Sequence, residues 1–169
     1  MSGSLIKIDE EVLSGTVSSV TLLGIDTTYE VYKVVISNAQ VTTDESDVKI
    51  RFTESDTPNT TANYDSAHYH LNSQQAFNTQ TETNSTSMDL SLNIGNDTGE
   101  AFNSVVYIFN APNSSEFTFI TCENTILSKT AELRGKQGGG VFTVTSAVNG
   151  IQFIESMDTG TFTLYGLKK

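Results

Sequence analysis

The sequence predicts an all-β protein, an antiparallel β-sandwich of eight to ten strands with jelly-roll-like connections. Apolar residues recur at every second position over much of the chain, which is the spacing of a half-buried strand. Turn-forming sequences separate these runs. Thr, Ser and Asn (24, 19 and 13 residues) make up 56 of the 169 residues. The helix formers Lys, Arg and Glu are scarce by comparison, and Thr favours strands.

Two segments show the alternation most clearly. In 47–53, Val, Ile and Phe alternate with Asp, Lys and Arg. In 88–94, four apolar residues are expected to face the core, while Asp89, Ser91 and Asn93 are expected to face water. The same criteria predict further strands at 17–25, 29–36, 105–109, 117–122, 141–145, 151–154 and 161–167.

The segment 54–87 departs from this pattern, with only seven apolar members among its 34 residues. A structureless loop of that length is improbable inside a compact domain. We therefore expect a strand in its middle, around 64–71, flanked by two long polar loops. Such loops often carry the contacts of a rigid β scaffold.

Turn signals separate the expected strands. Asn149-Gly150 between two apolar runs predicts a tight hairpin. The segments 96–99 and 158–160 predict further turns, and 111–113 is expected to end a strand. Only 125–134 has any helical character, and it is short.

The charge balance excludes one class of partner. Nine Lys and Arg against twenty Asp and Glu give a net charge of −11. A nucleic-acid binder gains its affinity from clustered cations, so we expect no nucleic-acid partner for this chain. No run approaches the length of about 18 apolar residues that a membrane span needs, so no membrane insertion is expected either.

Cysteine usage and the first residues bear on compartment and domain organisation. Cys122 is the only cysteine, so an intrachain disulfide is excluded, and its apolar neighbours predict a buried thiol. Residues 1–12 hold acidic residues and no apolar core of a signal peptide, so we expect synthesis in the cytoplasm. We interpret 1–12 as an N-terminal arm or edge strand that can add to a neighbouring subunit, and 13–169 as a single β-sandwich domain.

His68-Tyr69-His70 is the most distinctive local motif. Residues i and i+2 of a strand project to one side, so both imidazoles could reach one metal ion. A cupin-type site also needs a carboxylate a few residues later and a third histidine, and the sequence has neither. We therefore expect no metal and interpret the pair as surface histidines.

Aromatic residues divide into core and surface candidates. Tyr64, Tyr69 and His70, in the polar segment, are candidates with His68 for an exposed contact platform that stacks on sugars or partner loops. The simpler alternative is that they cover a sheet edge. Four phenylalanines at alternating strand positions are expected in the core: Phe52, Phe119, Phe153 and Phe162.

No pattern of catalytic residues is found. The Gly-rich segment 134–140 lacks the Gly-Lys-Ser/Thr ending of a phosphate-binding loop and predicts a flexible turn before Val141. The acid clusters at 9–11 and 44–47 are interpreted as solvated rims. We expect no catalytic residues, no cofactor and no enzymatic activity.

Four segments occur in a suggestive order: IDTTYEVY at 25–32, DVKIRF at 47–52, NYDSA at 63–67 and GTFTLYGL at 160–167. This order resembles a family of virion structural proteins of tailed bacteriophages, especially phages of marine cyanobacteria. The resemblance spans about 5–169, and His68-Tyr69-His70 departs from it. It implies a β-sandwich at the particle surface, tail or fibre, and no catalytic residues.

The leading hypothesis is a non-enzymatic virion component that docks on other virion proteins, and on further copies of itself, through edge strands and polar loops. The alternative is a receptor- or glycan-binding module of a tail or fibre, which would contact a host surface glycan. A third hypothesis, a glycan depolymerase, requires catalytic acids that the sequence does not single out.

Overall fold

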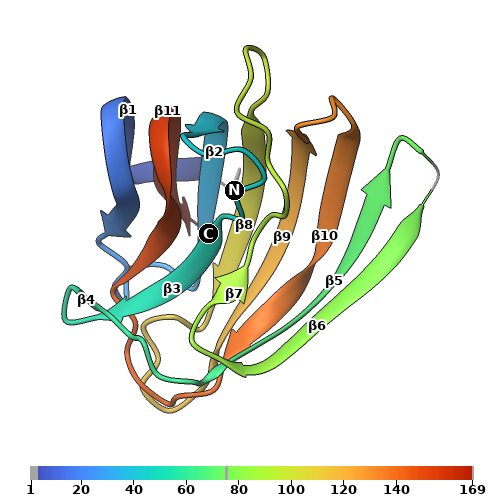
Figure 1. Cartoon of the computed structure of the whole chain (residues 1–169). Coiled ribbons are helices and arrows are strands. Elements are labelled where there is room, and N and C mark those ends of the chain that lie inside the picture. Colours follow the sequence, from blue (N-terminus) through green and yellow to red (C-terminus); the bar gives the residue numbers. More distant parts are fainter. Residues whose placement is uncertain (1–3, 75, 169) are drawn as a thin grey trace.

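A computed structural model describes residues 4–74 and 76–168, and it confirms the predicted all-β antiparallel class (Figure 1). Every strand pairing among these residues is antiparallel. The segment 125–134 is not helical, because it contains the end of one strand and the start of the next. The strands are β1 (Ser4–Leu23), β2 (Val31–Val41), β3 (Lys49–Glu54), β4 (Thr57–Pro58), β5 (Tyr64–Asn72), β6 (Phe77–Ser85), β7 (Met88–Asp89), β8 (Phe102–Phe109), β9 (Thr118–Leu127), β10 (Leu133–Phe142) and β11 (Gly150–Lys168).

The strands form one curled sheet in the order β4-β3-β11-β2-β8-β9-β10-β5-β6. The long strand β11 joins the two layers of the sandwich, since its first residues pair with β3 and its later residues pair with β2. β1 follows β11 along its other side over almost its whole length. The long sheet from β2 to β6 therefore has an inner face, toward β3 and β7, and an outer face.

The predicted turn at 158–160 lies inside β11 and is not a turn. The register of β11 with β2 shifts between Met157 and Thr159 and again between Thr159 and Thr161, and Gly160 has a φ of 132°. Such irregularities bend a strand and increase its twist. Here the bend lies after the residues that pair with β3 and among those that pair with β2, and the glycine provides the backbone freedom for it.

The predicted hairpin at Asn149-Gly150 is also wrong, because β10 and β11 are not neighbours in the sheet. Asn149 instead joins three elements: its backbone N–H donates to Thr53, its carbonyl accepts from Gly24, and its side chain bonds to Asp56. A Cβ on Gly150 would lie 2.5 Å from the Leu22 carbonyl oxygen. The glycine is required for close backbone approach.

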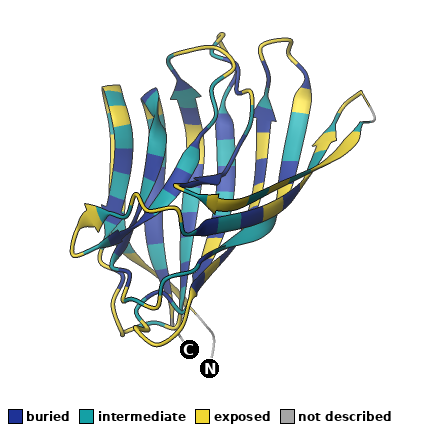
Figure 2. Ribbon diagram, turned by 60° about the horizontal axis from the view of Figure 1, so that its bottom comes forward, coloured by how far each residue is buried: buried dark blue, intermediate teal, exposed yellow. Residues whose placement is uncertain are grey.

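The core lies between the inner face and the layer that contains β3 and β7, and Figure 2 shows buried and exposed residues alternating along the strands. Phe52, Phe153 and Phe162 are fully buried as predicted, and Cys122 is buried as well. Phe119 is the exception. It lies on the outer face and is 45% exposed, because the inward positions of β9 are held by its even-numbered residues.

The segment 88–94 crosses the inner face as a strap and is regular strand only at Met88–Asp89. Asp89 and Ser91, expected to face water, are buried. The strap is held on both sides. The Leu90 N–H donates to the Val48 carbonyl, and the Leu90 carbonyl accepts from the Asn124 side chain.

The Gly-rich segment 134–140 is part of β10 and not a flexible turn. A Cβ on Gly138 would lie 2.7 Å from His68, and one on Gly140 would lie 2.3 Å from the sulfur of Met88. These glycines let β5 and the strap approach β10 closely.

The polar segment 54–87 contains the expected strand as β5, and also β6, which the sequence analysis missed. Of residues 1–12, interpreted as an arm or edge strand, 4–12 form the start of β1 and pair with 161–168 of the same chain, and 1–3 lie outside the described residues. Ile8 and Leu13 pack against the core. β1 is thus an edge strand of its own sheet.

Candidate functional site

The four residues of the expected platform do not share one surface. Tyr64, His68 and His70 point to the inner face of β5, and Tyr69 points to the outer face. Tyr64 and His68 are buried, and His70 is half-buried. Only Tyr69, 52% exposed, remains a candidate for surface contact.

Tyr64 is part of the core. Its ring stacks on Phe142 with centroids 4.8 Å apart. Its hydroxyl accepts from the Phe52 N–H at 3.2 Å and donates to the Asn59 carbonyl at 2.9 Å. Burial raises the pKa of Tyr64 to about 12, so the phenol stays protonated and keeps both bonds.

The two histidines lie on one side of the strand, as the i, i+2 spacing predicts, but they are not surface histidines. Neither ring nitrogen of His68 has a hydrogen-bond partner among the described residues. Burial, together with the nearby Lys136 ammonium, lowers the pKa of His68 to about 3. His70 bonds to the Gln80 side chain at 3.0 Å. The described residues contain no group of three His, Cys, Asp or Glu suited to a metal ion.

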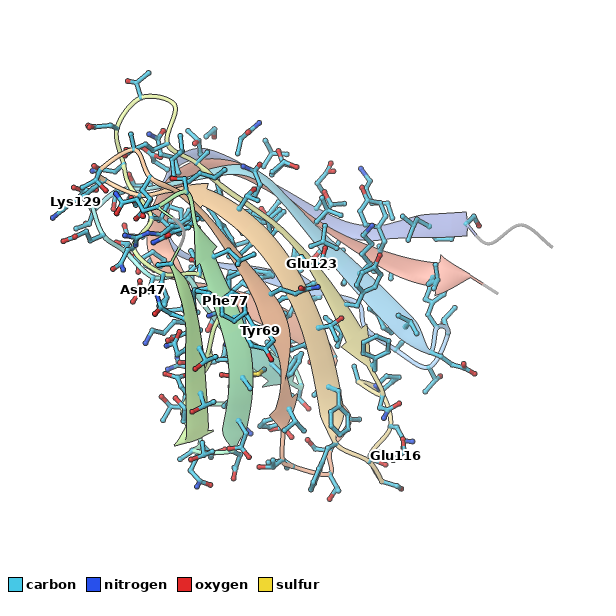
Figure 3. All side chains as sticks on the ribbon, turned by 90° about the vertical axis from the view of Figure 1, so that its right-hand side faces the viewer. Asp47, Tyr69, Phe77, Glu116, Glu123 and Lys129 are labelled. Carbon is cyan, nitrogen blue, oxygen red and sulfur yellow. The ribbon has the colours of Figure 1, made fainter. Side chains whose placement is uncertain are left out.

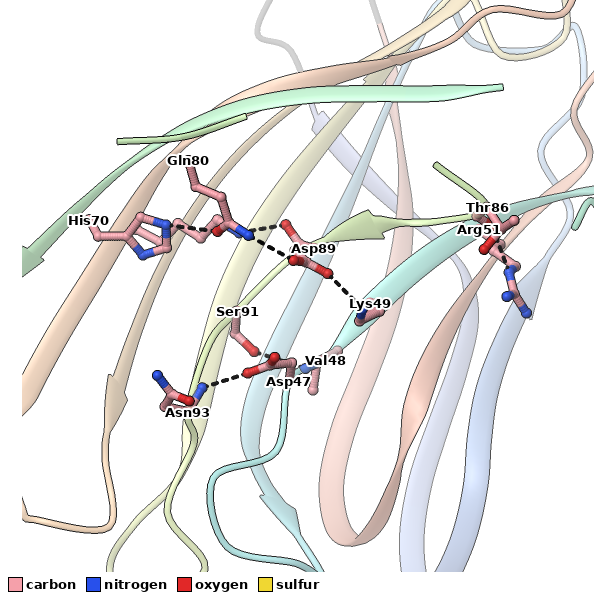
Figure 4. A network of polar contacts seen from close by, with 11 residues as sticks. Asp47, Val48, Lys49, Arg51, His70, Gln80, Thr86, Asp89, Ser91 and Asn93 are labelled. Atoms are coloured by element: carbon pink, nitrogen blue, oxygen red, sulfur yellow. Dashed lines mark hydrogen bonds and ion pairs between the residues drawn. The ribbon is translucent and has the colours of Figure 1, made fainter. Parts of the chain in front are cut away.

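A polar network fixes the strap to the sheet (Figure 4). The Asp89 carboxylate accepts from Gln80 at 2.9 Å and pairs with Lys49 at 3.2 Å. Asp47 accepts from the Asn93 backbone at 2.7 Å. These contacts join β6, β3 and the strap, and the network is structural.

Lys136 completes the network from β10. It is 4% exposed, and its ammonium donates to the Asp89 carbonyl at 2.6 Å. Burial lowers the pKa of Lys136 to about 8, although Asp89 opposes the shift. A lysine with a lowered pKa is a candidate nucleophile in an open site. This one is buried and hydrogen-bonded to the Asp89 carbonyl.

The outer face carries a line of exposed aromatic side chains instead. Tyr69 on β5 and Phe77 on β6 lie with ring centroids 5.0 Å apart, and Figure 3 shows them together with Glu123 further along the same face. Tyr107 on β8 lies beneath the Lys33 ammonium, 5.4 Å from its ring centroid. Exposed rings of this kind are typical of contact surfaces.

Two hollows lie between these rings, with volumes of about 660 and 520 Å³. Both are bordered by Val105, Glu123 and Gln137. Gln137 donates to the Glu123 carboxylate at 2.8 Å, so the pair forms a polar ridge between the hollows. Gly135 contributes no side chain to the floor of the larger hollow.

The sequence analysis missed Phe77, Tyr107, Glu123 and Gln137. One signal was available in 118–127, where strict alternation with Ile120 and Cys122 puts Glu123 on the solvent side together with Phe119. The threonines at 79, 81 and 83 recur with the period of a strand and mark β6. Which strands become neighbours, and so which outward residues meet, is not encoded locally.

Comparison with family models, with curated proteins and with solved structures finds no match for this chain. In the part of the chain that the structure describes, no helix is long and apolar enough to cross a membrane. The structure defines a class only, an all-β antiparallel protein with exposed aromatic residues on one sheet face.

Proposed function

We propose that this protein is a non-enzymatic structural component of a tailed-phage virion that docks on other virion proteins, including copies of itself, through an edge strand. The docking proposal is based on one observation, the free edge of β6. Within the described residues, β6 pairs with β5 alone and ends the sheet.

The backbone of β6 presents unpaired groups to solvent. The Asn72 N–H donates toward β6, to Ala76, whereas the Ser73 N–H donates toward β10, to Leu133. Backbone groups of an antiparallel strand alternate sides, and Thr79 lies opposite Tyr69. The N–H and C=O groups of Thr79 and Thr81 therefore point to the free edge, ready to pair with another strand.

The edge strands β1 and β6 differ in how far they are protected against pairing with another chain. The β1 edge carries Lys7, Asp9, Glu10 and Glu11, and its register with β11 shifts three times. Charges and bulges are the usual protection of an edge strand. The 77–81 stretch of β6 has no charge, no proline and no register shift. Docking is thus assigned to β6 and not to the N-terminal segment.

The virion assignment has separate support. The segments 25–32, 47–52, 63–67 and 160–167 occur in an order that resembles virion structural proteins. The all-β architecture fits that expectation. An exterior rich in Thr, Ser and Asn with a net charge of −11 keeps a protein soluble without help from chaperones.

The hollowed outer face favours a second candidate, a receptor- or glycan-binding module, since it combines exposed rings with hydrogen-bonding groups.

The test is incorporation of the chain into purified particles, measured by quantitative mass spectrometry. Thr79→Pro removes one N–H from the free edge and leaves the β5–β6 ladder intact. We expect about a tenfold loss of incorporation for this variant, as for a lost contact worth about 1.4 kcal/mol.

Thr79→Val is the matched control, because it keeps the N–H and the strand conformation, and we expect it to incorporate normally. Thermal unfolding confirms that both variants are folded. Absence of the chain from particles would contradict the virion assignment. Normal incorporation of folded Thr79→Pro would contradict docking through β6.

A further inference from the structure

We propose that the outer sheet face is a binding site for a neutral oligosaccharide, centred on Glu123 and Gln137 and flanked by Tyr69, Phe77 and Tyr107. This inference rests on the second candidate function. It is independent of docking through β6, because it uses side chains of the face and not the backbone of the edge.

The site is built from one continuous row of facing residues. The strand register places Tyr69 opposite Gln137, Gln137 opposite Glu123, and Glu123 opposite Val105. Strands lie about 4.8 Å apart, so the row from β5 to β8 spans about 14 Å. A ligand that lies across the strands meets aromatic, polar and apolar groups in turn.

The depth of the site comes from small residues. Gly135 lies in the row next to that of Tyr69, opposite Leu71 and Thr125. On the other side, Gly138 borders the smaller hollow. The resulting hollows of about 660 and 520 Å³ fall within the range of about 300 to 1,000 Å³ seen for small-ligand sites.

The chemistry of the lining matches a sugar. A pyranose ring has an apolar face that packs on an aromatic ring, and hydroxyls at its rim. Tyr69 and Phe77 are 52% and 60% exposed and provide the ring surfaces at one end, and Tyr107, which lies beneath Lys33, borders the other hollow. The carboxylate of Glu123 accepts hydrogen bonds, and the amide of Gln137 both donates and accepts. A protein partner would favour a contiguous apolar centre, whereas here the polar pair of Glu123 and Gln137 separates the two hollows.

Charge restricts the ligand to neutral glycans. Glu123 lies at the middle of the site, between the two hollows. The chain as a whole carries a net charge of −11. An acidic polysaccharide would be repelled by the Glu123 carboxylate and by the net negative charge of the chain, while a neutral oligosaccharide is not.

The experiment is isothermal titration of the full chain with a panel of neutral gluco-, manno- and galacto-oligosaccharides, and with oligogalacturonate as the acidic probe. We expect saturable binding to at least one neutral oligosaccharide and none to the acidic probe. Tyr69→Ala removes a stacking surface, and Gly135→Val fills the larger hollow without a clash, since a Cβ there meets only the Asn124 carbonyl oxygen at 3.6 Å. Each should weaken binding about tenfold or more.

Two matched controls separate the site from the fold. Phe117→Ala removes an exposed ring that does not line the hollows, and Gly15→Val adds a side chain at a position with open space around it. Both should bind like the unmodified chain. Lack of binding to every neutral oligosaccharide, equal binding of the acidic probe, or unchanged binding by folded Tyr69→Ala and Gly135→Val would each overturn the proposal. Failure here leaves incorporation into particles unaffected, so the two proposals can fail separately.

Discussion

The hydroxyl of Tyr64 accepts a hydrogen bond from the backbone N–H of Phe52, 3.2 Å away, and so ties β5 to β3 across the core. Tyr64→Phe removes this bond and the one to the Asn59 carbonyl and leaves buried backbone groups unsatisfied. We expect a loss of about 1–3 kcal/mol in the free energy of unfolding, measured by urea denaturation. Tyr69→Phe, on the outer face, should change it by less than about 0.5 kcal/mol. Equal effects of the two variants would contradict the division of β5 into a core face and a surface face.

His68 makes stability depend on pH in the acidic range. Its pKa is about 3 in the folded chain, against 6.5 for an ordinary histidine, because the ring is buried beside Lys136 and His70, although Asp89 opposes the shift. Between these values the unfolded chain binds a proton that the folded chain does not, so stability falls as pH falls. The contribution of His68 is at most about 1.4 kcal/mol per pH unit, and it is confined to the range between pH 6.5 and the folded pKa of about 3.

Denaturation of His68→Leu from pH 7 to pH 4 isolates this contribution, since the other titrating groups are shared with the unmodified chain. The difference in unfolding free energy between the two proteins should change with pH in the stated direction. His70→Leu serves as control for the half-buried neighbour and should show a smaller change. A pH-independent difference for His68→Leu would show that His68 is not held neutral by burial.

Gly150 is a contact position and not a turn residue. Gly150→Ala places a methyl group 2.5 Å from the Leu22 carbonyl oxygen, so β1 or β3 must shift. We expect a loss of about 1–3 kcal/mol, the usual cost of overpacking. Gly15→Ala has open space around it and is the control, with a neutral or small effect. The measurement is thermal unfolding of both variants, and a loss for Gly150→Ala as small as that for Gly15→Ala would contradict the close contact with Leu22.

Local alternation predicted the fold class and most of the core from the sequence. It succeeded at Ile50 and Phe52, which are both buried, because period-two burial is a property of a single strand. It failed at Asp89, because the strap is covered on both faces by elements that are distant in the sequence. The alternating position of Phe119 also predicted a core residue, and this prediction is wrong because the inward positions of β9 are those of Ile120 and Cys122.

The candidate site was less predictable than the core. Of the four expected platform residues, only Tyr69 reaches the outer face, because three of them have the inward parity of β5. The glycines of β10 were interpreted as a turn, since only the packing of His68 and Met88 against them reveals their role. The neighbours of Tyr69 on the outer face depend on the sheet order, which sequence periodicity does not determine.

The central claim is that β6 is the docking edge, and hydrogen–deuterium exchange tests it most directly. The exchange of peptides that cover 77–85 and 4–14 is compared between the isolated chain and the assembled particle. In the isolated chain, the N–H groups of Thr79 and Thr81 have no partner on the free edge and should exchange quickly. We predict that assembly slows exchange in 77–85 and leaves 4–14 unchanged. Unchanged exchange in 77–85, with protection of 4–14 instead, would contradict the account.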